Sequence, residues 1–202
     1  MLPDLVLIVE GHGDVVAMPH VVAKIGASCG LPLYTSRPIR SRGWGSIKKA
    51  GGLEGFVQLA ASRHGCERVL IVVDLDDGCP VTERGLLAGR IDKLHERYGV
   101  SIEICFCIRE FEAWLLASLE ELPESDLKPG LDLPIERHDL IRDAKGSLRK
   151  FLEDGYSETA DQGELAKRID PSKLYQRDRS FRRFVKATTG IEYPDLDLML
   201  AL

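Results

Sequence analysis

Acidic residues follow directly after three of the most apolar runs in the sequence. They are Glu10, Asp14, Asp74, Asp76, Glu110 and Glu112. Carboxylates that gather at one place repel one another and resist burial, so a cluster of them needs a counter-charge. Their hard oxygen atoms suit Mg²⁺ or Mn²⁺, and these ions also bind phosphates. The residue types therefore favour metal-assisted phosphoryl chemistry, in which a bound ion activates water and neutralises the reacting phosphate.

Most of these acids also have a purely structural interpretation. Glu10 could end its strand and cap the helix that follows. Asp14 could be an N-cap or first-turn residue that the helix dipole stabilises. Glu110 and Glu112 could form the solvated first turn of an acidic helix. The sequence leaves both interpretations open at each of the four positions.

The stretch "VVDLDD" carries the pattern Asp-x-Asp in Asp74 and Asp76. Asp and Gly favour turns, so a turn would account for the composition of this stretch. At the end of a strand, however, side chains two positions apart point to the same side. A shared metal site is therefore the favoured interpretation of Asp74 and Asp76, whereas Asp77 points the other way and ranks below them.

The elements that must position these residues alternate between strand and helix over residues 5–122. Apolar runs predict strands, and helical spacing predicts helices between them: strands at 5–9, 31–39, 68–77 and 101–108, helices at 14–28, 53–65, 81–99 and 109–122. Such alternation predicts an α/β fold with a mostly parallel, Rossmann-like sheet and helices on both faces. Ligands of these sheets bind beyond the carboxyl ends of the strands, where the acids are expected to meet.

Two features qualify this arrangement. Pro19 lies inside the helix predicted at 14–28, and it implies either a kink or a helix that begins there. The character of the sequence changes after residue 122, where prolines and charges precede several short helical patterns. We therefore predict an α/β core over 1–122 and a helical extension over 123–202 that packs on it.

The order of the two acidic motifs resembles the Toprim domain of topoisomerases, primases and OLD-family nucleases. The Toprim signature is a strand-end Glu followed by Gly, then a later Asp-x-Asp, and "VEGHGD" with "VVDLDD" matches it. The resemblance implies that Glu10 is the general base or a metal ligand and that Asp74 and Asp76 are metal ligands. The spacing of Glu10 and Asp14 resembles the OLD-type nuclease pattern, and Asp14 and Glu112 would complete the metal shell. No catalytic Tyr domain is present, which argues against topoisomerase activity.

The wider chain is similar to a bacterial Toprim-like family of unknown function, encoded near AAA-type ATPases in defence-type gene clusters. The stretch "EFEAWLLA" at 110–117 and the later "LRKFL" and "SFRRF" match elements expected in that family. This resemblance implies a nuclease dependent on Mg²⁺ or Mn²⁺ that acts on DNA or RNA and works with an ATPase partner. The alternative is a non-catalytic subunit that docks an ATPase or a nucleic acid. A phosphotransfer domain, in which strand-end Asp residues bind Mg²⁺ as in doubly wound receiver proteins, ranks last. No Lys that matches the one in receiver proteins follows a late strand.

A basic loop after the second predicted strand is a candidate nucleic-acid contact. It holds Arg37, Arg40, Arg42, Trp44, Lys48 and Lys49. Cations bind phosphates, and an exposed aromatic ring can stack on a base. A solvated loop with Trp44 anchored in the core accounts for the composition equally well. A second basic run at 175–186 contains Phe181 and Phe184, whose spacing predicts a buried stripe. Lys145, in a later helix, could face the site.

Composition restricts the class of protein further. The chain has 202 residues and a formal net charge of −5, which argues against a protein coated in positive charge. Its five cysteines form no Cys-x-x-Cys pair, so reduced thiols are expected rather than disulfides or a zinc site. The first apolar run is too short for a signal peptide, and no run is long enough to span a membrane. We therefore expect a cytoplasmic protein.

Overall fold

Four parallel strands form the centre of the fold, in the order β2-β1-β3-β4. The computed structural model describes residues 4–201. The strands are β1 (Leu5–Val9), β2 (Ile39–Arg40), β3 (Arg68–Leu75) and β4 (Ser101–Ile108). Because all four run in the same direction, their carboxyl ends lie at one edge of the sheet. The α/β fold with a parallel sheet is confirmed.

Both faces of the sheet are buried, which explains why the strands are continuous apolar runs. Alternate side chains point to opposite faces. Leu5, Leu7 and Val9 of β1 belong to one apolar cluster, whereas Val6 and Ile8 belong to the other. Strands of a parallel sheet are covered by helices on both sides, so they carry no polar face.

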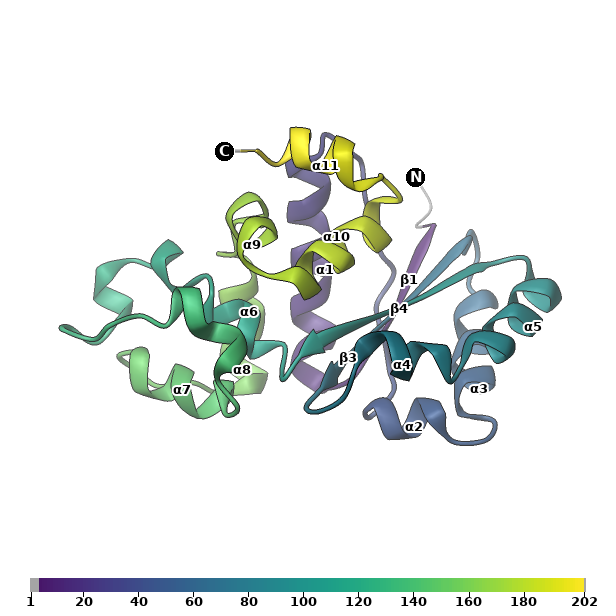
Figure 1. The fold of residues 1–202 in the computed structure, drawn as a ribbon, viewed down its shortest axis with the longest axis horizontal. Coiled ribbons are helices and arrows are strands. Elements are labelled where there is room, and N and C mark those ends of the chain that lie inside the picture. Colours follow the sequence, from purple (N-terminus) through teal and green to yellow (C-terminus); the bar gives the residue numbers. More distant parts are fainter. Residues whose placement is uncertain (1–3, 202) are drawn as a thin grey trace.

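Helices cover the two faces in separate layers (Figure 1). The second cluster joins the sheet to α2 (Trp44–Lys48), α3 (Gly52–Ala61) and α5 (Ala88–Tyr98). The first cluster joins it to α1 (His12–Ser28) and to helices from the second half of the chain. The remaining elements are α4 (Pro80–Gly85), α6 (Glu112–Leu116), α7 (Ala144–Phe151), α8 (Glu158–Ala166), α9 (Pro171–Arg177), α10 (Arg179–Thr189) and α11 (Tyr193–Met199), with short 3-10 turns at Leu119–Glu121, Glu124–Asp126 and Ile135–Leu140.

The helices after residue 122 pack against α1, β4 and α6. Trp114 of α6 is fully buried, stacks edge-on against Phe181 of α10 and donates a hydrogen bond to Ser180. Phe181 and Phe184 are likewise fully buried, so the predicted apolar stripe is confirmed. The helical character of the extension is confirmed too, while the boundary at 122 stays a prediction.

Several predicted elements differ in extent from those observed. The strand predicted at 31–39 is reduced to Ile39–Arg40 and one isolated bridge at Thr35, because Pro32 and Pro38 have no N–H for a ladder. Helix α1 begins at His12 and runs through Pro19. The helix predicted at 81–99 is two helices, and the one predicted at 109–122 is a short helix followed by a 3-10 turn.

The cysteines and the helices of the described residues bear on two expectations from composition. All five cysteines are free thiols, and burial raises the pKa of Cys105 to about 12, so this thiol stays protonated. Among residues 4–201, no helix combines the length and apolar character that crossing a lipid bilayer demands.

Candidate functional site

A hollow of about 350 Å³ opens at the carboxyl edge of the sheet. Side chains from both halves of the chain line it: Glu10, Gly11, His12, Asp14, Arg40, Arg42, Asp74, Glu112, Lys145, Glu158 and Gln162. Four of the predicted acids, Glu10, Asp14, Asp74 and Glu112, therefore meet in one place. They come from the ends of β1 and β3, from the first turn of α1 and from the start of α6.

Glu10 and Asp74 are in direct contact. The backbone N–H of Asp74 donates a hydrogen bond of 3.1 Å to Oε2 of Glu10. Oδ1 of Asp74 in turn accepts a hydrogen bond of 2.9 Å from the N–H of Phe111. Burial raises the pKa of Glu10, and burial together with Asp14, Glu10 and Glu112 raises the pKa of Asp74 well above its usual range. The pair resists ionisation unless a cation is close.

Asp14 is buried in the first turn of α1 and contacts two other parts of the hollow. Its Oδ2 accepts a hydrogen bond of 2.8 Å from the N–H of Gly11, so Asp14 closes the start of the helix. Its Oδ1 accepts one of 3.1 Å from Nε2 of Gln162. Burial raises its pKa, and the charge of Glu158 adds to the effect. Helix capping therefore occupies one oxygen of Asp14, and Gln162 holds the other beside the hollow.

Glu112 is 1% exposed and is held from three sides. Tyr156 donates a hydrogen bond of 2.8 Å to Oε1, Gln162 donates one of 3.4 Å, and Nζ of Lys145 lies 3.8 Å away. Burial raises the pKa of Glu112 to about 7, even though Lys145 and Tyr156 act to lower it. This carboxyl therefore titrates near neutral pH.

Lys145, at the start of α7, contributes a positive charge to the hollow. Its Nζ lies 3.2 Å from Glu158 and 3.8 Å from Glu112. Burial would lower its pKa, but Glu112, Glu158 and Glu110 outweigh burial and raise it. Lys145 stays charged and faces the site, as the sequence suggested.

Two glycines allow the chain to close around these acids. A Cβ atom at Gly13 would lie 1.7 Å from Oε1 of Gln162 and 2.8 Å from the carbonyl oxygen of Glu158. Only glycine lets α8 approach α1 this closely. Gly43 has a φ of +104°, and a Cβ there would lie 3.1 Å from Oε1 of Glu10. Gly13 and Gly43 thus allow the chain to pack closely against Gln162 and Glu10.

The other predicted acids lie outside the hollow. Asp76 is exposed and does not line it, although its charge raises the pKa of Glu10. Asp77 is exposed and forms ion pairs with Arg109 at 2.9 Å and Arg142 at 3.5 Å. Glu110 accepts hydrogen bonds from the first two N–H groups of α7, at 3.1 and 3.2 Å. Glu110 thereby fixes the start of the helix that carries Lys145.

The basic loop is divided between the site and the core. Arg40 and Arg42 line the hollow, and Arg42 is held at a φ of +67° with its N–H donating to the carbonyl of Glu10. Trp44 is 8% exposed, packs edge-on against Phe106 and donates a hydrogen bond to Glu83. Trp44 is therefore anchored in the core, as one of its two interpretations predicted. Its ring is not free to stack on a base.

The remaining cations of the loop point elsewhere. Lys48 forms an ion pair of 2.9 Å with the same Glu83 that binds Trp44. Arg37 and Lys49 are exposed and do not line the hollow. Arg40 and Arg42 are thus the members of the predicted set that could contact a ligand of the site.

The carboxylate oxygens of the hollow are of the kind that binds a hard cation, but they are not preassembled around one. Within residues 4–201, no three His, Cys, Asp or Glu side chains are arranged to hold a metal ion. The carboxylates are nevertheless oxygen donors of the kind that Mg²⁺ and Mn²⁺ prefer. Oε1 of Gln162 is buried beside them and has no hydrogen-bond partner in the described structure. A buried acceptor without a partner is costly, and a cation with its waters would satisfy it.

Three residues of the site were not found from the sequence. Tyr156, Glu158 and Gln162 lie far from the other acids along the chain, and they are single polar residues in an unremarkable stretch. Gln162 lies on the buried face of α8, and a polar residue at an apolar helical position was the only signal available.

Comparison with known proteins places the chain in a family. The family model described as "Domain of unknown function (DUF4276)" matches residues 9–187. The chain belongs to the DUF4276 family. The match covers every side chain of the hollow, so the site lies wholly within the DUF4276 region. The comparisons with curated proteins and with solved structures gave no match.

Proposed function

We propose that the hollow is a Toprim-type active site that hydrolyses phosphodiester bonds of DNA or RNA with the help of Mg²⁺ or Mn²⁺. One observation carries the proposal. A single hollow is lined by Glu10, Asp14, Asp74 and Glu112, and burial of each of these side chains raises its pKa. The hydrogen bonds that these acids accept do not offset the cost of burying them together, because the pKa of each stays raised. Perturbed carboxyls in a cleft are typical of functional sites.

The residues that would hold the ion are Glu10, Asp14 and Asp74, with Glu112 beside them. When bound, the ion supplies Lewis acidity and a water of lowered pKa. Asp76 would act from outside through its charge on Glu10. In this assignment Glu10-Gly11 and Asp74-x-Asp76 keep the order of the Toprim signature. Of the two aspartates, Asp74 is the one that would hold the ion.

The chain's own residues would bind and orient the substrate. Glu10, with its raised pKa, is suited to accept a proton from the attacking water. Lys145 would stabilise negative charge on the reacting phosphate. Arg40 and Arg42 lie on the rim of the same hollow and would bind neighbouring phosphates of the strand.

The resemblance to a bacterial family encoded near AAA-type ATPases supports a proposal about the cellular role of the chain. We assign the chain the role of nuclease effector in an ATPase-linked bacterial defence system. The partner would gate the nuclease, because an unregulated one would damage the host. The order of the acidic motifs and the "EFEAWLLA" element support this role.

One observation favours a second candidate function, a non-catalytic binding or regulatory subunit. Nζ of Lys145 lies within ion-pair distance of both Glu112 and Glu158, where it neutralises part of the cluster without a metal. A remnant site stabilised in this way could dock a nucleic acid or an ATPase. This alternative predicts that the protein binds no divalent ion.

Titration calorimetry with Mn²⁺ and a cleavage assay together test the two candidates. The substrates are single- and double-stranded DNA and RNA, incubated with the purified protein and Mn²⁺. We expect cleavage by the wild type and a loss of at least about 100-fold in Glu10→Gln. Asp92→Asn, an exposed change on α5, is the matched control. Mn²⁺ binding without cleavage, or cleavage that survives in Glu10→Gln, would contradict the nuclease; no Mn²⁺ binding would favour the regulatory subunit.

A further inference from the structure

Strand β4 forms an open edge of the sheet. It pairs with β3 along its whole length, and no other strand in residues 4–201 pairs with it. The N–H of Ser101 and that of Arg109 donate to carbonyls at the two ends of β3. Since N–H and C=O groups of a strand alternate between its two sides, the odd-numbered residues of β4 face β3. The even-numbered Ile104, Phe106 and Ile108 therefore direct their N–H and C=O groups outward.

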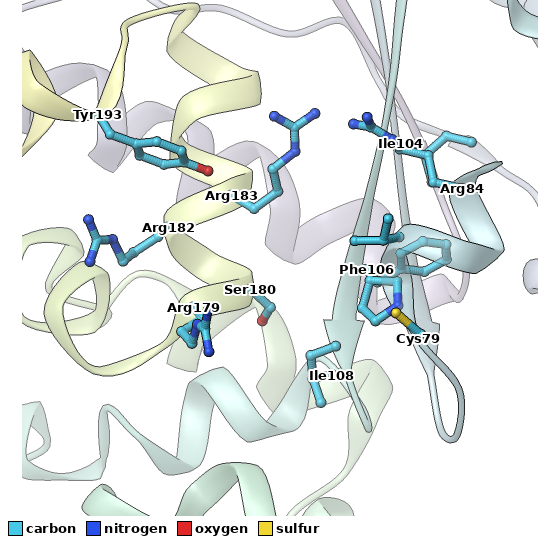
Figure 2. Close-up of a pocket in the computed structure, with 12 residues that line it drawn as sticks. Cys79, Arg84, Ile104, Phe106, Ile108, Arg179, Ser180, Arg182, Arg183 and Tyr193 are labelled. Carbon is cyan, nitrogen blue, oxygen red and sulfur yellow. The ribbon is translucent and has the colours of Figure 1, made fainter. Parts of the chain in front are cut away.

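A cleft of about 880 Å³ lies along this edge (Figure 2). The same three residues, Ile104, Phe106 and Ile108, line it. Ile104 and Phe106 are 2% and 5% exposed, so water has little access there. No backbone hydrogen bond from another element reaches the outer side of β4 in the described part of the chain. Unpaired backbone groups in such a place form a template for another strand.

The two walls of the cleft differ in character. On the α4 side the cleft is lined by the apolar Pro80 and Val81 together with Arg84, and Val81 is 78% exposed. On the α10 side stand Arg179 and Arg183 (Figure 2). A strand added to β4 would direct alternate side chains to the two walls.

The charge around the cleft is positive. Four arginines line it, namely Arg84, Arg179, Arg182 and Arg183. Arg84 and Arg183 both contact Glu103, and Arg182 contacts Asp197. Four cations against two carboxylates leave two positive charges in excess. Arg179 is exposed and forms no ion pair within residues 4–201.

We propose that this cleft binds an extended segment of a partner protein, which adds a fifth strand to the sheet beside β4. The segment alternates apolar residues, which contact Pro80, Val81 and Phe106, with acidic residues, which contact Arg179 and Arg183. The outward N–H and C=O groups of β4 supply affinity for its backbone. The cleft lies on a different edge from the acidic hollow, and the inference does not depend on the nuclease activity.

The positive charge of the cleft and the unpaired backbone groups of β4 favour a peptide strand over two other occupants. A second copy of β4 would bring one set of arginines against another, which like charges oppose. A nucleic-acid strand has no backbone N–H and C=O groups to pair with an apolar strand edge.

A fluorescent peptide of alternating Val and Glu tests the proposal. The peptide has eight residues, the length of β4. Fluorescence anisotropy measures its binding, and a peptide of alternating Val and Lys is the charge control. We expect the Val-Glu peptide to bind and the Val-Lys peptide to bind at least about tenfold more weakly, because charges across an interface decide the partner. Amide hydrogen exchange on the complex locates the peptide. The N–H groups of Ile104, Phe106 and Ile108 should gain protection, whereas those of Cys105 and Cys107 are already paired with β3.

Two variants of equal charge change complete the test. Arg179→Glu lies in the cleft, and Lys93→Glu lies on the exposed side of α5. We expect at least about tenfold weaker binding in Arg179→Glu and unchanged binding in Lys93→Glu, with thermal unfolding confirming that both fold. The proposal is overturned if the Val-Glu peptide fails to bind at about 1 mM, the weak end of specific affinities. Equal binding of the Val-Lys peptide, or protection confined to other amides, overturns it too. So does an oligonucleotide that binds the cleft in place of the peptide and is lost in Arg179→Glu.

Discussion

The backbone N–H of Asp74 donates a hydrogen bond of 3.1 Å to the carboxylate of Glu10, although the two residues are 64 positions apart. Strands β1 and β3 are neighbours in register, with Val9 opposite Val72, so the residues that follow them meet at the edge of the sheet. The contact places two acids of the cluster side by side.

Asp74→Asn should stabilise the metal-free protein. The folded state raises the pKa of Asp74 well above its usual value, so ionised Asp74 destabilises the fold at neutral pH. The amide keeps an oxygen to accept the hydrogen bond from Phe111. We expect a rise of about 2–4 °C in Tm at pH 7, measured by calorimetry without metal. Added Mn²⁺ should raise Tm in the wild type only. A lower Tm in the variant would mean that the carboxylate stabilises the fold.

Glu112→Gln should change how stability depends on pH. The unfolded carboxyl titrates near 4.5 and the folded one at about 7. Ionisation of Glu112 therefore reduces the free energy of unfolding as pH rises from 4.5 to about 7, and the full reduction persists above that range. The variant should equal the wild type near pH 4 and exceed it by on the order of 1 kcal/mol near pH 8. Urea unfolding at several pH values measures this, and parallel curves would contradict it.

Lys145→Gln should strengthen Mn²⁺ binding while lowering cleavage. Lys145 competes with a metal for the acids, since its charge lowers the pKa of Glu10 and Asp74. Without it the hollow is more negative, and we expect about tenfold tighter Mn²⁺ binding near pH 8 by calorimetry. Cleavage should fall because the phosphate loses its cation. The control is Lys150→Gln, an exposed change on the same helix. Weaker Mn²⁺ binding in Lys145→Gln would show that Lys145 does not compete.

Gly13→Ala should separate α8 from α1. The added methyl group would collide with Gln162 and with the backbone of Glu158. We expect a loss of about 1–3 kcal/mol in the free energy of unfolding, together with weaker Mn²⁺ binding. Gly55→Ala in α3, where no atom lies within 4 Å of the new Cβ, is the matched control and should be neutral or stabilising. An unchanged Gly13→Ala protein would exclude the close contact.

The buried pair of His138 and Asp178 should give stability a second dependence on pH. Burial lowers the pKa of His138, but hydrogen bonds to Asp178 at 2.8 Å and to the carbonyl of Ile135 outweigh burial and raise it. Burial raises the pKa of Asp178, but its hydrogen bonds outweigh that and lower it. The contribution of His138 is complete below 6.5 and is lost as pH rises through its folded pKa.

The contribution of Asp178 is complete above 3.8 and is lost as pH falls through its lowered pKa. The pair should therefore stabilise the protein most between about pH 4 and 6.5. His138→Gln should remove the loss on the alkaline side, which unfolding at a series of pH values would detect. An unaltered pH profile in this variant would assign the dependence to other groups.

Much of the sheet could be predicted from local sequence. Strands β1, β3 and β4 are long apolar runs, and a parallel sheet buried on both faces demands such runs. Strand β2 could not be predicted in its true length, because its pairing depends on the neighbouring β1 and is interrupted by Pro38. Pro19 gave no reliable helix boundary, since packing on the sheet holds α1 together through it.

The site could be predicted where strand order alone determines position. Glu10 directly follows β1, and Asp74 lies near the end of the adjacent parallel strand β3, so their meeting is a consequence of topology. Asp76 follows the same strand as Asp74, but the chain turns away after Leu75 and leaves it exposed. Gln162 and Tyr156 depend on how α8 docks against α1, and that docking leaves no pattern in a single sequence.

The wall that α7 and α8 build around the acids also fixes when the site is completed. Lys145, Glu158 and Gln162 leave the ribosome after every other residue of the hollow. Since chains fold during synthesis from the N-terminus onward, a nascent chain presents its carboxylates without their lysine or their closing helix. A translation product interrupted before residue 145 would therefore carry the four acids of the hollow without Lys145, Glu158 and Gln162.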